Sequence, residues 1–202
     1  MNNKFIYVFI FLCITGCAAT KHKDPCQIDC VTPYGTVLGN SGGVEAFSNC
    51  QAECPSFEIN RVDGIYTGVK WQCVEYARRW LLFHQGAVYG DVDNAADIWA
   101  KVDHLTHVAS GKQIKLETHL NGSRQPPQPG DLLLYARSFN NTGHVAIVTD
   151  IDFDSNMIEL GEQNYTNLPW PNAHARKIEF VKRGENYWLL DGFLLGWKHM
   201  VD

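Results

Sequence analysis

Residues 72–85, QCVEYARRWLLFHQ, decide the fold. Apolar side chains recur in this stretch at the spacing of one broad helix face. They are Val74, Tyr76, Ala77, Trp80, Leu81 and Phe83. Gly86 follows at the place where a glycine commonly ends a helix. The stretch therefore predicts a central, mostly buried helix from Gln72 to Gln85.

The segments that follow predict a second helix and then a sheet. Asn94 is a good N-cap, and apolar residues at helical spacing extend from there to about His107. After the proline-rich residues 125–130, the hydrophobic period shortens to that of β-strands. The expected strands are Leu132–Ala136, His144–Asp150, Met157–Gly161, Arg176–Val181, Trp188–Asp191 and Leu194–His199. Helices followed by an antiparallel sheet predict an α+β fold.

Length and composition are those of one globular domain. The chain has 202 residues, of which 45% are hydrophobic and 19% charged, and such a chain buries a real core. Residues 26–63 are rich in Gly, Ser, Asn and Cys, and they predict short strands and loops that form an arm rather than a separate domain. We expect a domain over residues 33–202, preceded by a cysteine-containing linker, residues 17–32.

Residues 1–16 are typical of an export signal. Lys4 supplies a positive charge, and residues 5–14 are apolar but too short to span a bilayer. The end of this segment, Ile14-Thr15-Gly16-Cys17, resembles the lipobox of bacterial lipoproteins, where cleavage leaves a lipid-modified cysteine at the N-terminus. The alternative is a plain signal peptide cut after Ala19. We expect an exported protein of the bacterial cell envelope, anchored through a lipid on Cys17 and facing the periplasm.

The cysteines separate into a structural set and one leftover thiol. Two Cys-x-x-x-Cys pairs are formed by Cys26, Cys30, Cys50 and Cys54. In an oxidising compartment these predict two disulfides of open connectivity, and a four-cysteine zinc site is the alternative. Cys13 leaves with the signal and Cys17 would carry lipid, so Cys73 has no partner. A leftover thiol in an exported protein requires an explanation.

Several classes of ligand are not expected. The formal net charge is −5, and no run of Lys and Arg exceeds the pair Arg78-Arg79, so nucleic acid is an unsuitable partner. His104 and His107 are three positions apart on the second predicted helix, but no third metal ligand accompanies them. We therefore expect no nucleic acid, no metal and no other cofactor.

Cys73 lies at the predicted start of the central helix. The unpaired N–H groups and the dipole at this helix end stabilise an anion, so they favour the reactive thiolate. The N–H group of Cys73 itself is free to stabilise a developing oxyanion. These features predict a nucleophile, and the alternative is a small buried core thiol.

A base and a group that orients it are available further along the chain. His144 opens an apolar strand after the turn at residues 140–143, and Glu162 ends the next strand. A hairpin that turns near residues 154–156 would return both to one edge of the sheet. His144 can then take the proton of Cys73 while Glu162 orients the imidazole. The alternative is a solvated Glu162, with Asn164 or Asp150 as the orienting group.

Several motifs together resemble those of a known family. They are WQCVEYARRW at residues 71–80, TGHVAI at 142–147, EQN at 162–164, YGTVLG at 34–39, GGV at 42–44, NGS at 121–123 and LGW at 195–197. They are similar to those of the CHAP family of cysteine amidohydrolases, and most closely to the amidase domains of glutathionylspermidine synthetase/amidases. The resemblance covers roughly residues 33–198.

The resemblance implies a papain-like fold of the CHAP/NlpC-P60 type, with the nucleophile's helix packed on an antiparallel sheet. It implies that Cys73 attacks, that His144 is base and then acid, and that Glu162 orients His144. It also implies that Gln72 lies beside the oxyanion and that Arg78 and Asn164 contact substrate. Arg78 is five positions after Cys73, about 140 degrees around a helix, so a surface arginine is the alternative.

The expected activity is hydrolysis of an amide through an acyl-enzyme thioester. The expected substrate is either a glutathionylspermidine-like amide or a peptide of peptidoglycan. The chain ends at Asp202, so we expect neither an ATP-using synthetase domain nor ATP as a partner. The alternative to an enzyme is a non-catalytic, membrane-anchored binding module of the cell envelope.

Overall fold

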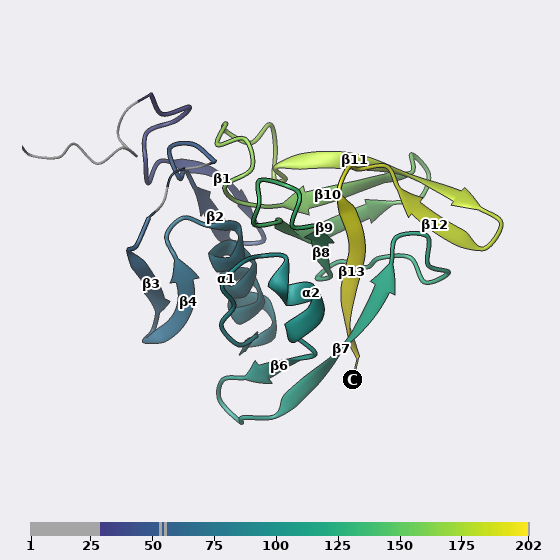
Figure 1. The fold of residues 1–202 in the computed structure, drawn as a ribbon, viewed down its shortest axis with the longest axis horizontal. Coiled ribbons are helices and arrows are strands. Elements are labelled where there is room, and N and C mark those ends of the chain that lie inside the picture. Colours follow the sequence, from purple (N-terminus) through teal and green to yellow (C-terminus); the bar gives the residue numbers. More distant parts are fainter. Residues whose placement is uncertain (1–28, 53, 55, 202) are drawn as a thin grey trace, which may run out of the picture.

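The computed structural model describes residues 29–52, 54 and 56–201 (Figure 1). The first half of the chain holds β1 (Val37–Ser41), β2 (Val44–Phe47), β3 (Ile59–Val62), β4 (Ile65–Val69), α1 (Cys73–Gln85), β5 (Ala87–Val88), α2 (Asp97–Lys101) and β6 (His104–His107). The second half holds β7 (Gln113–Leu120), β8 (Leu132–Tyr135), β9 (Val145–Asp152), β10 (Met157–Gly161), β11 (Arg176–Arg183), β12 (Asn186–Leu189) and β13 (Leu194–Val201). No helix in these described ranges is long and apolar enough to cross a bilayer.

One large antiparallel sheet dominates the fold. Its strand order is β12-β11-β10-β9-β8-β13-β7-β6-β5, and two hairpins, β1-β2 and β3-β4, complete the strands of the described residues. The sheet is strongly twisted: in Figure 1, β10 and β11 run across the view, whereas β13 runs down it. The arrangement of one central helix against an antiparallel sheet confirms the α+β prediction.

The helix α1 packs against one face of this sheet. Its Tyr76, Ala77 and Leu81 are at most 1% exposed, and they form one core with alternate residues of β8 and β9. Gly86 ends the helix with φ 58°, in the left-handed region that suits glycine, and its N–H donates to the carbonyl of Leu82. The predicted helix is therefore confirmed at both ends to within one residue.

A second core lies on the other face of the sheet, where the alternate residues of β8 and β9 point. Its members include Leu133, Ala146, Val148, Ile158, Leu160, Ile178, Phe180 and Trp197. Successive side chains of a strand point to opposite faces, so β8 and β9 supply both cores. This explains why these strands read as continuous apolar runs rather than as alternating patterns.

The β9-β10 hairpin carries a β-bulge that matters for the site. Glu159 pairs with Asp150, but the next residue, Leu160, pairs with Val148, so Thr149 is skipped. The extra residue shifts the register by one, and side chains of one strand change faces relative to the other. Beyond the bulge, Glu162 lies on the same face as His144, whereas an unshifted ladder would place them on opposite faces.

The amino-terminal hairpin β1-β2 contributes to the core around α1. Val44 and Ala46 of β2 are 1% and 0% exposed and pack with α1. A disulfide joins Cys30 to Cys50, and Cys54 is also disulfide-bonded, so a four-cysteine zinc site is wrong. Cys26, the predicted export signal of residues 1–16 and the predicted lipidation site Cys17 lie outside the described residues.

The second predicted helix is wrong beyond Lys101. The helix α2 covers only Asp97–Lys101, and His104–His107 forms strand β6 between β5 and β7. Ile98 and Leu105 are fully buried, as the pattern required, but a short helix followed by a strand buries the same positions. The strand β7 was not predicted at all, although Ile114, Leu116 and Leu120 stand at alternate positions in it, and most of its residues are exposed.

The predicted strands of the carboxyl-terminal half exist with shifted ends. Met157–Gly161 is correct, and β8, β9, β11, β12 and β13 differ from their predicted ends by one to two residues. The largest consequence is that His144 precedes β9 instead of opening it. His144 is therefore held by the turn before the strand as well as by the sheet.

Candidate active site

Cys73 is the first residue of α1, and among the described residues it is the free cysteine. It is 9% exposed, and the first helical hydrogen bond runs from Tyr76 N–H to the carbonyl of Gln72. The N–H groups before Tyr76 have no carbonyl one turn earlier to bind. One of them, that of Val74, donates to the Cys73 sulfur, as does the N–H of Val145. A thiolate is therefore well solvated by the backbone at this position.

A chain of hydrogen bonds leads from the Cys73 sulfur into the sheet. The imidazole of His144 is hydrogen-bonded to Cys73. Its Nε2 lies 2.8 Å from Oε2 of Glu162, which leaves Nδ1 for the sulfur. His144 and Glu162 are 1% and 3% exposed, so the predicted alternative of a solvated Glu162 is wrong.

The chain continues beyond Glu162 through an arginine that the sequence did not reveal. Arg176 donates from Nε to Oε1 of Glu162 at 2.6 Å and from Nη1 to Oδ2 of Asp191 at 2.6 Å. Its Nη2 donates to the hydroxyl of Tyr135 at 2.7 Å, and that hydroxyl donates to Asp191 at 2.8 Å. This hydrogen-bond network thus fixes Glu162 through Oε1, while Oε2 contacts His144.

These contacts shift the ionisation of all three groups. Burial raises the pKa of the Cys73 thiol, but the His144 charge and hydrogen bond outweigh it, so the pKa falls below 9.0. Burial lowers the pKa of His144, but the charges and hydrogen bonds of Cys73 and Glu162 raise it to about 9. Burial likewise raises the pKa of Glu162, and His144 and Arg176 bring it below its ordinary value. The site therefore favours a thiolate–imidazolium pair.

The ion pair predicts an unusual pH dependence for alkylation of Cys73 by iodoacetamide. The thiolate is present above the lowered thiol pKa, and the imidazolium persists up to about 9. Because His144 lowers the pKa of the Cys73 thiol, we expect the half-maximal rate at a lower pH than for an ordinary cysteine thiol. At pH 6, the rate should exceed that of a His144→Ala variant by about tenfold or more. A profile that follows an ordinary thiol would contradict the ion pair.

Gln72 and Asn164 lie together beside Cys73. Asn164 donates from Nδ2 to Oε1 of Gln72 at 2.8 Å, and both residues line the same hollow as Cys73 and His144. Gln72 Nε2 has two longer contacts of 3.4 Å, with Asn49 Oδ1 and the Cys54 carbonyl. Asn164 therefore orients the Gln72 amide, and the Gln72 Nε2 donor is held loosely at the lining of the hollow that contains Cys73.

Arg78 is buried rather than on the surface. It is 1% exposed, and its guanidinium donates to the carbonyls of Tyr89, Thr67 and Gly90 and to the Asp91 carboxylate. An arginine has five N–H donors, and the one left, on Nη1, has no partner among the described residues. Arg78 also lines the hollow on the second side of Cys73. It holds the loop at residues 89–91 and presents at most one donor to a ligand.

A buried polar cluster fixes the start of α1 against the end of β10. Glu75 is 0% exposed and pairs with Arg79 at 2.7 Å. Gln163 donates from Nε2 to the Gln72 carbonyl and to Glu75, each at 3.2 Å. Because Gln163 follows Glu162 directly, this cluster sets the distance between the nucleophile's helix and the His144–Glu162 pair.

The two histidines considered as metal ligands do not lie on a helix. His104 and His107 are the two ends of β6, and they contact Asp103 and Ser110 respectively. Among the described residues, no group of three or more His, Cys, Asp and Glu side chains is arranged to hold a metal ion.

Comparison with known proteins agrees with this geometry. Residues 64–164 match the CHAP domain, a span that contains Cys73, His144 and Glu162. The chain belongs to the CHAP family. At the level of that family it is a cysteine-dependent amidohydrolase, an enzyme that hydrolyses C–N bonds. The predicted resemblance is confirmed.

Curated relatives of this CHAP domain are much longer proteins. The chain is 35% identical over 181 residues to the bifunctional glutathionylspermidine synthetase/amidase of Escherichia coli, covering 82% of this chain and 29% of that protein. It is 32% identical over 161 residues to the trypanothione synthetase of Crithidia fasciculata, covering 79% and 24% respectively. The glutathionylspermidine synthase of Crithidia fasciculata is 30% identical over 182 residues, covering 83% and 25%.

Sequence reasoning missed several residues that shape this CHAP site. Glu75 and Arg79 had a local signal, since a charged pair four positions apart sits on the apolar side of a helix. Arg176 and Asp191 had none, because only the pairing of distant strands brings them to Glu162.

Proposed function

We propose that this chain hydrolyses an amide bond between a peptide-like acyl group and an amine, with Cys73 as nucleophile. The observation that carries the proposal is the hydrogen-bonded series Cys73–His144–Glu162, buried at the start of a helix. Family membership supports the same reaction.

The reaction follows from the positions of the donors. The Cys73 thiolate attacks the amide carbonyl carbon, and the oxygen becomes an oxyanion beside the Cys73 N–H and the Gln72 amide. His144, as imidazolium, gives its proton to the amine nitrogen, and the C–N bond breaks to leave a thioester. Water then attacks the thioester as His144 takes a proton, and the acid and the free thiolate are released.

Two hollows that meet at Cys73 suggest how the substrate lies. His144 lines one of them, together with Asn140, Asn141 and Gly143. The amine must leave on this side, because His144 protonates it. The acyl group then occupies the other hollow, where Asp91 and Asp93 stand at the lining. Asp91 is paired there with Arg78, so the lining of this hollow offers charges of both signs to a polar acyl group.

A glutathionylspermidine-like amide is the first candidate substrate. The support is the relative from Escherichia coli, whose name includes a glutathionylspermidine amidase activity and which matches 82% of this chain. A peptidoglycan peptide is the second candidate, and the support for it is the export signal read from residues 1–17.

Incubation of the purified full-length chain with each substrate tests the proposal. We expect glutathione and spermidine in equal amounts from glutathionylspermidine, detected as new thiol-containing acid and free amine. New amines from purified peptidoglycan alone would favour the second candidate. Release that persists in a Cys73→Ala chain would contradict the mechanism, and no release from either substrate would contradict both substrate assignments.

We also propose that the protein is exported and held at a membrane of the bacterial envelope through Cys17. The support is the pattern of an apolar segment followed by Ile14-Thr15-Gly16-Cys17. Fractionation of bacteria that make the full chain tests this location: recovery of the unprocessed chain in the cytosol would overturn it.

A non-catalytic binding module of the envelope is the competing function. A disulfide at Cys73 would have favoured it, but Cys73 is free and hydrogen-bonded to His144. The described residues therefore give no support to a non-catalytic function.

A further inference from the structure

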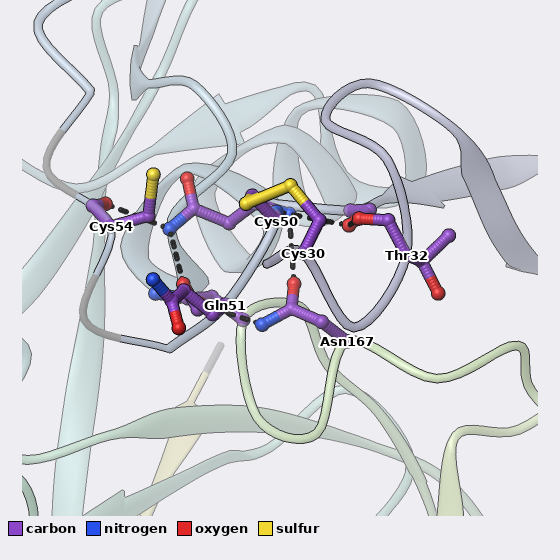
Figure 2. The surroundings of a disulfide bond; sticks show 9 residues. Cys30, Thr32, Cys50, Gln51, Cys54 and Asn167 are labelled. Carbon is purple, nitrogen blue, oxygen red and sulfur yellow. Dashed lines mark hydrogen bonds between the residues drawn. A yellow bond between two sulfur atoms is a disulfide. The ribbon is translucent and has the colours of Figure 1, made fainter. Parts of the chain in front are cut away.

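A disulfide-bound loop forms one wall of the hollow that contains the nucleophile. Ala52 and Cys54 line this hollow together with Cys73 and His144. The loop begins at Cys50, which is joined to Cys30, and Figure 2 shows Gln51 and Cys54 gathered beside this bond. The wall is therefore held by covalent links as well as by hydrogen bonds.

Asn49 connects this loop to the start of α1. It is 0% exposed, and its Nδ2 donates to the carbonyls of Gln51 at 3.2 Å and Cys54 at 2.9 Å. Its Oδ1 accepts from Trp71 N–H at 3.3 Å and Gln72 Nε2 at 3.4 Å. One buried amide thus contacts both the loop and the Gln72 side chain, which lines the same hollow as Cys73.

The backbone around Asn49 is fixed on both sides. Asn49 N–H donates to Oδ1 of Asn167 at 2.8 Å. The next residue, Cys50, has φ 74°, a conformation that costs a non-glycine residue free energy and persists only when its surroundings impose it. The bond to Cys30 and the hydrogen bond from Cys50 N–H to Ser48 supply that constraint.

The contacts of Gln72 show what Asn49 controls. Asn164 fixes the side-chain Oε1 of Gln72 at 2.8 Å, so the exact direction of Nε2 depends on its two weaker acceptors. These are Oδ1 of Asn49 and the Cys54 carbonyl, and Asn49 itself holds the latter. At 3.4 Å both contacts are long enough for Nε2 to turn to a stronger acceptor when one forms.

We propose that Asn49 is a positioning residue that aims the Gln72 amide at the oxyanion, and that the Cys30–Cys50 disulfide holds Asn49 in place. The inference rests on the proposed hydrolysis through Cys73. It predicts two separate roles. His144 stabilises the Cys73 thiolate, and Asn49 affects only the tetrahedral intermediate, through the Gln72 amide.

Two reagents separate these roles without the natural substrate. Iodoacetamide alkylates the thiolate by displacement of iodide and forms no oxyanion. p-Nitrophenyl acetate acylates the same sulfur through a tetrahedral oxyanion, after which the C–O bond to nitrophenolate breaks. Oxyanion donors therefore affect the rate of acylation by p-nitrophenyl acetate and not the rate of alkylation by iodoacetamide.

We expect Asn49→Ala to lower the acylation rate about tenfold, as a small misplacement of a catalytic group does, and to change alkylation less than about twofold. In a Gln72→Ala background, the same substitution should change acylation less than about twofold, because Asn49 acts through the missing amide. The Cys30→Ser/Cys50→Ser chain should show part of the Asn49→Ala effect and serves if Asn49→Ala does not fold.

The matched control is Asn121→Ala. Asn121 also bridges backbone groups, through Nδ2 to the Leu189 carbonyl and Oδ1 from the Leu189 N–H, but it lies outside the site. Its removal should leave both rates unchanged. The proposal would be overturned if Asn49→Ala lowered the acylation rate equally with and without Gln72. It would also be overturned if Asn49→Ala left the acylation rate unchanged, or if it lowered the alkylation rate by the same factor. An unaltered glutathionylspermidine would instead contradict the substrate assignment alone.

Discussion

Replacement of Cys73 with alanine is expected to lower amide hydrolysis by about 10⁴-fold or more, because no other described group can form the acyl intermediate. Cys73→Ser should be almost as inactive, since its hydroxyl does not ionise beside His144 as a thiol does. Steady-state release of amine from glutathionylspermidine measures the effect.

The thermal stability of the variants is the control for this substitution. Cys73 is a small residue at the edge of the core, so both variants should unfold within a few degrees of the wild-type chain. Iodoacetamide labelling near neutral pH should disappear with the thiol. Hydrolysis within about tenfold of wild type in a folded Cys73→Ala chain would contradict the nucleophile.

Glu162→Gln is expected to lower kcat by about 10² to 10⁴-fold while leaving the chain folded. The change keeps the side-chain volume but removes the negative charge that helps to hold the His144 pKa near 9. The imidazolium is then less stable, so the Cys73 thiolate is less populated. Arg176 keeps its ion pair with Asp191, which limits the loss of stability.

Three measurements define the outcome for Glu162→Gln. The kcat should fall, the half-maximal pH of Cys73 alkylation should rise, and the melting temperature should change little. Glu159→Gln is the matched control, because Glu159 is a carboxylate of the same hairpin that pairs instead with His174 and Lys177. It should keep kcat within about twofold. Equal effects of the two substitutions would show that Glu162 does not act through His144.

The parts of the fold that could be predicted from sequence are those with local signals. The helix α1 was predicted because one broad apolar face and a terminal glycine lie within a single stretch. The hairpin of β9 and β10 was predicted because two apolar runs flank a turn, and it correctly brought His144 and Glu162 to one edge. These local signals were enough to place the three central residues of the candidate site.

The parts that could not be predicted depend on contacts between distant segments. Helical spacing across residues 94–107 fits either one helix or a helix followed by a strand, and only pairing with β5 and β7 decides for the strand. Arg176 reaches Glu162 because β11 pairs with β10, and Asn49 contacts Gln72 across 23 positions of the chain. Neither contact has a local signal in the amino-acid sequence.

The extra residue Thr149 separates the register at the turn of the β9-β10 hairpin from the register at its open end. Deletion of Thr149 alone would leave Leu160 opposite Val148 and Gly161 opposite Ile147, so Glu162 would stay on the face of His144 in a regular ladder. Deletion of a second residue would shift that regular ladder by one position and turn Glu162 away from the imidazole. An evolving chain could therefore lose the bulge and keep its chemistry, but a further single deletion in the hairpin would cost it the orienting carboxylate.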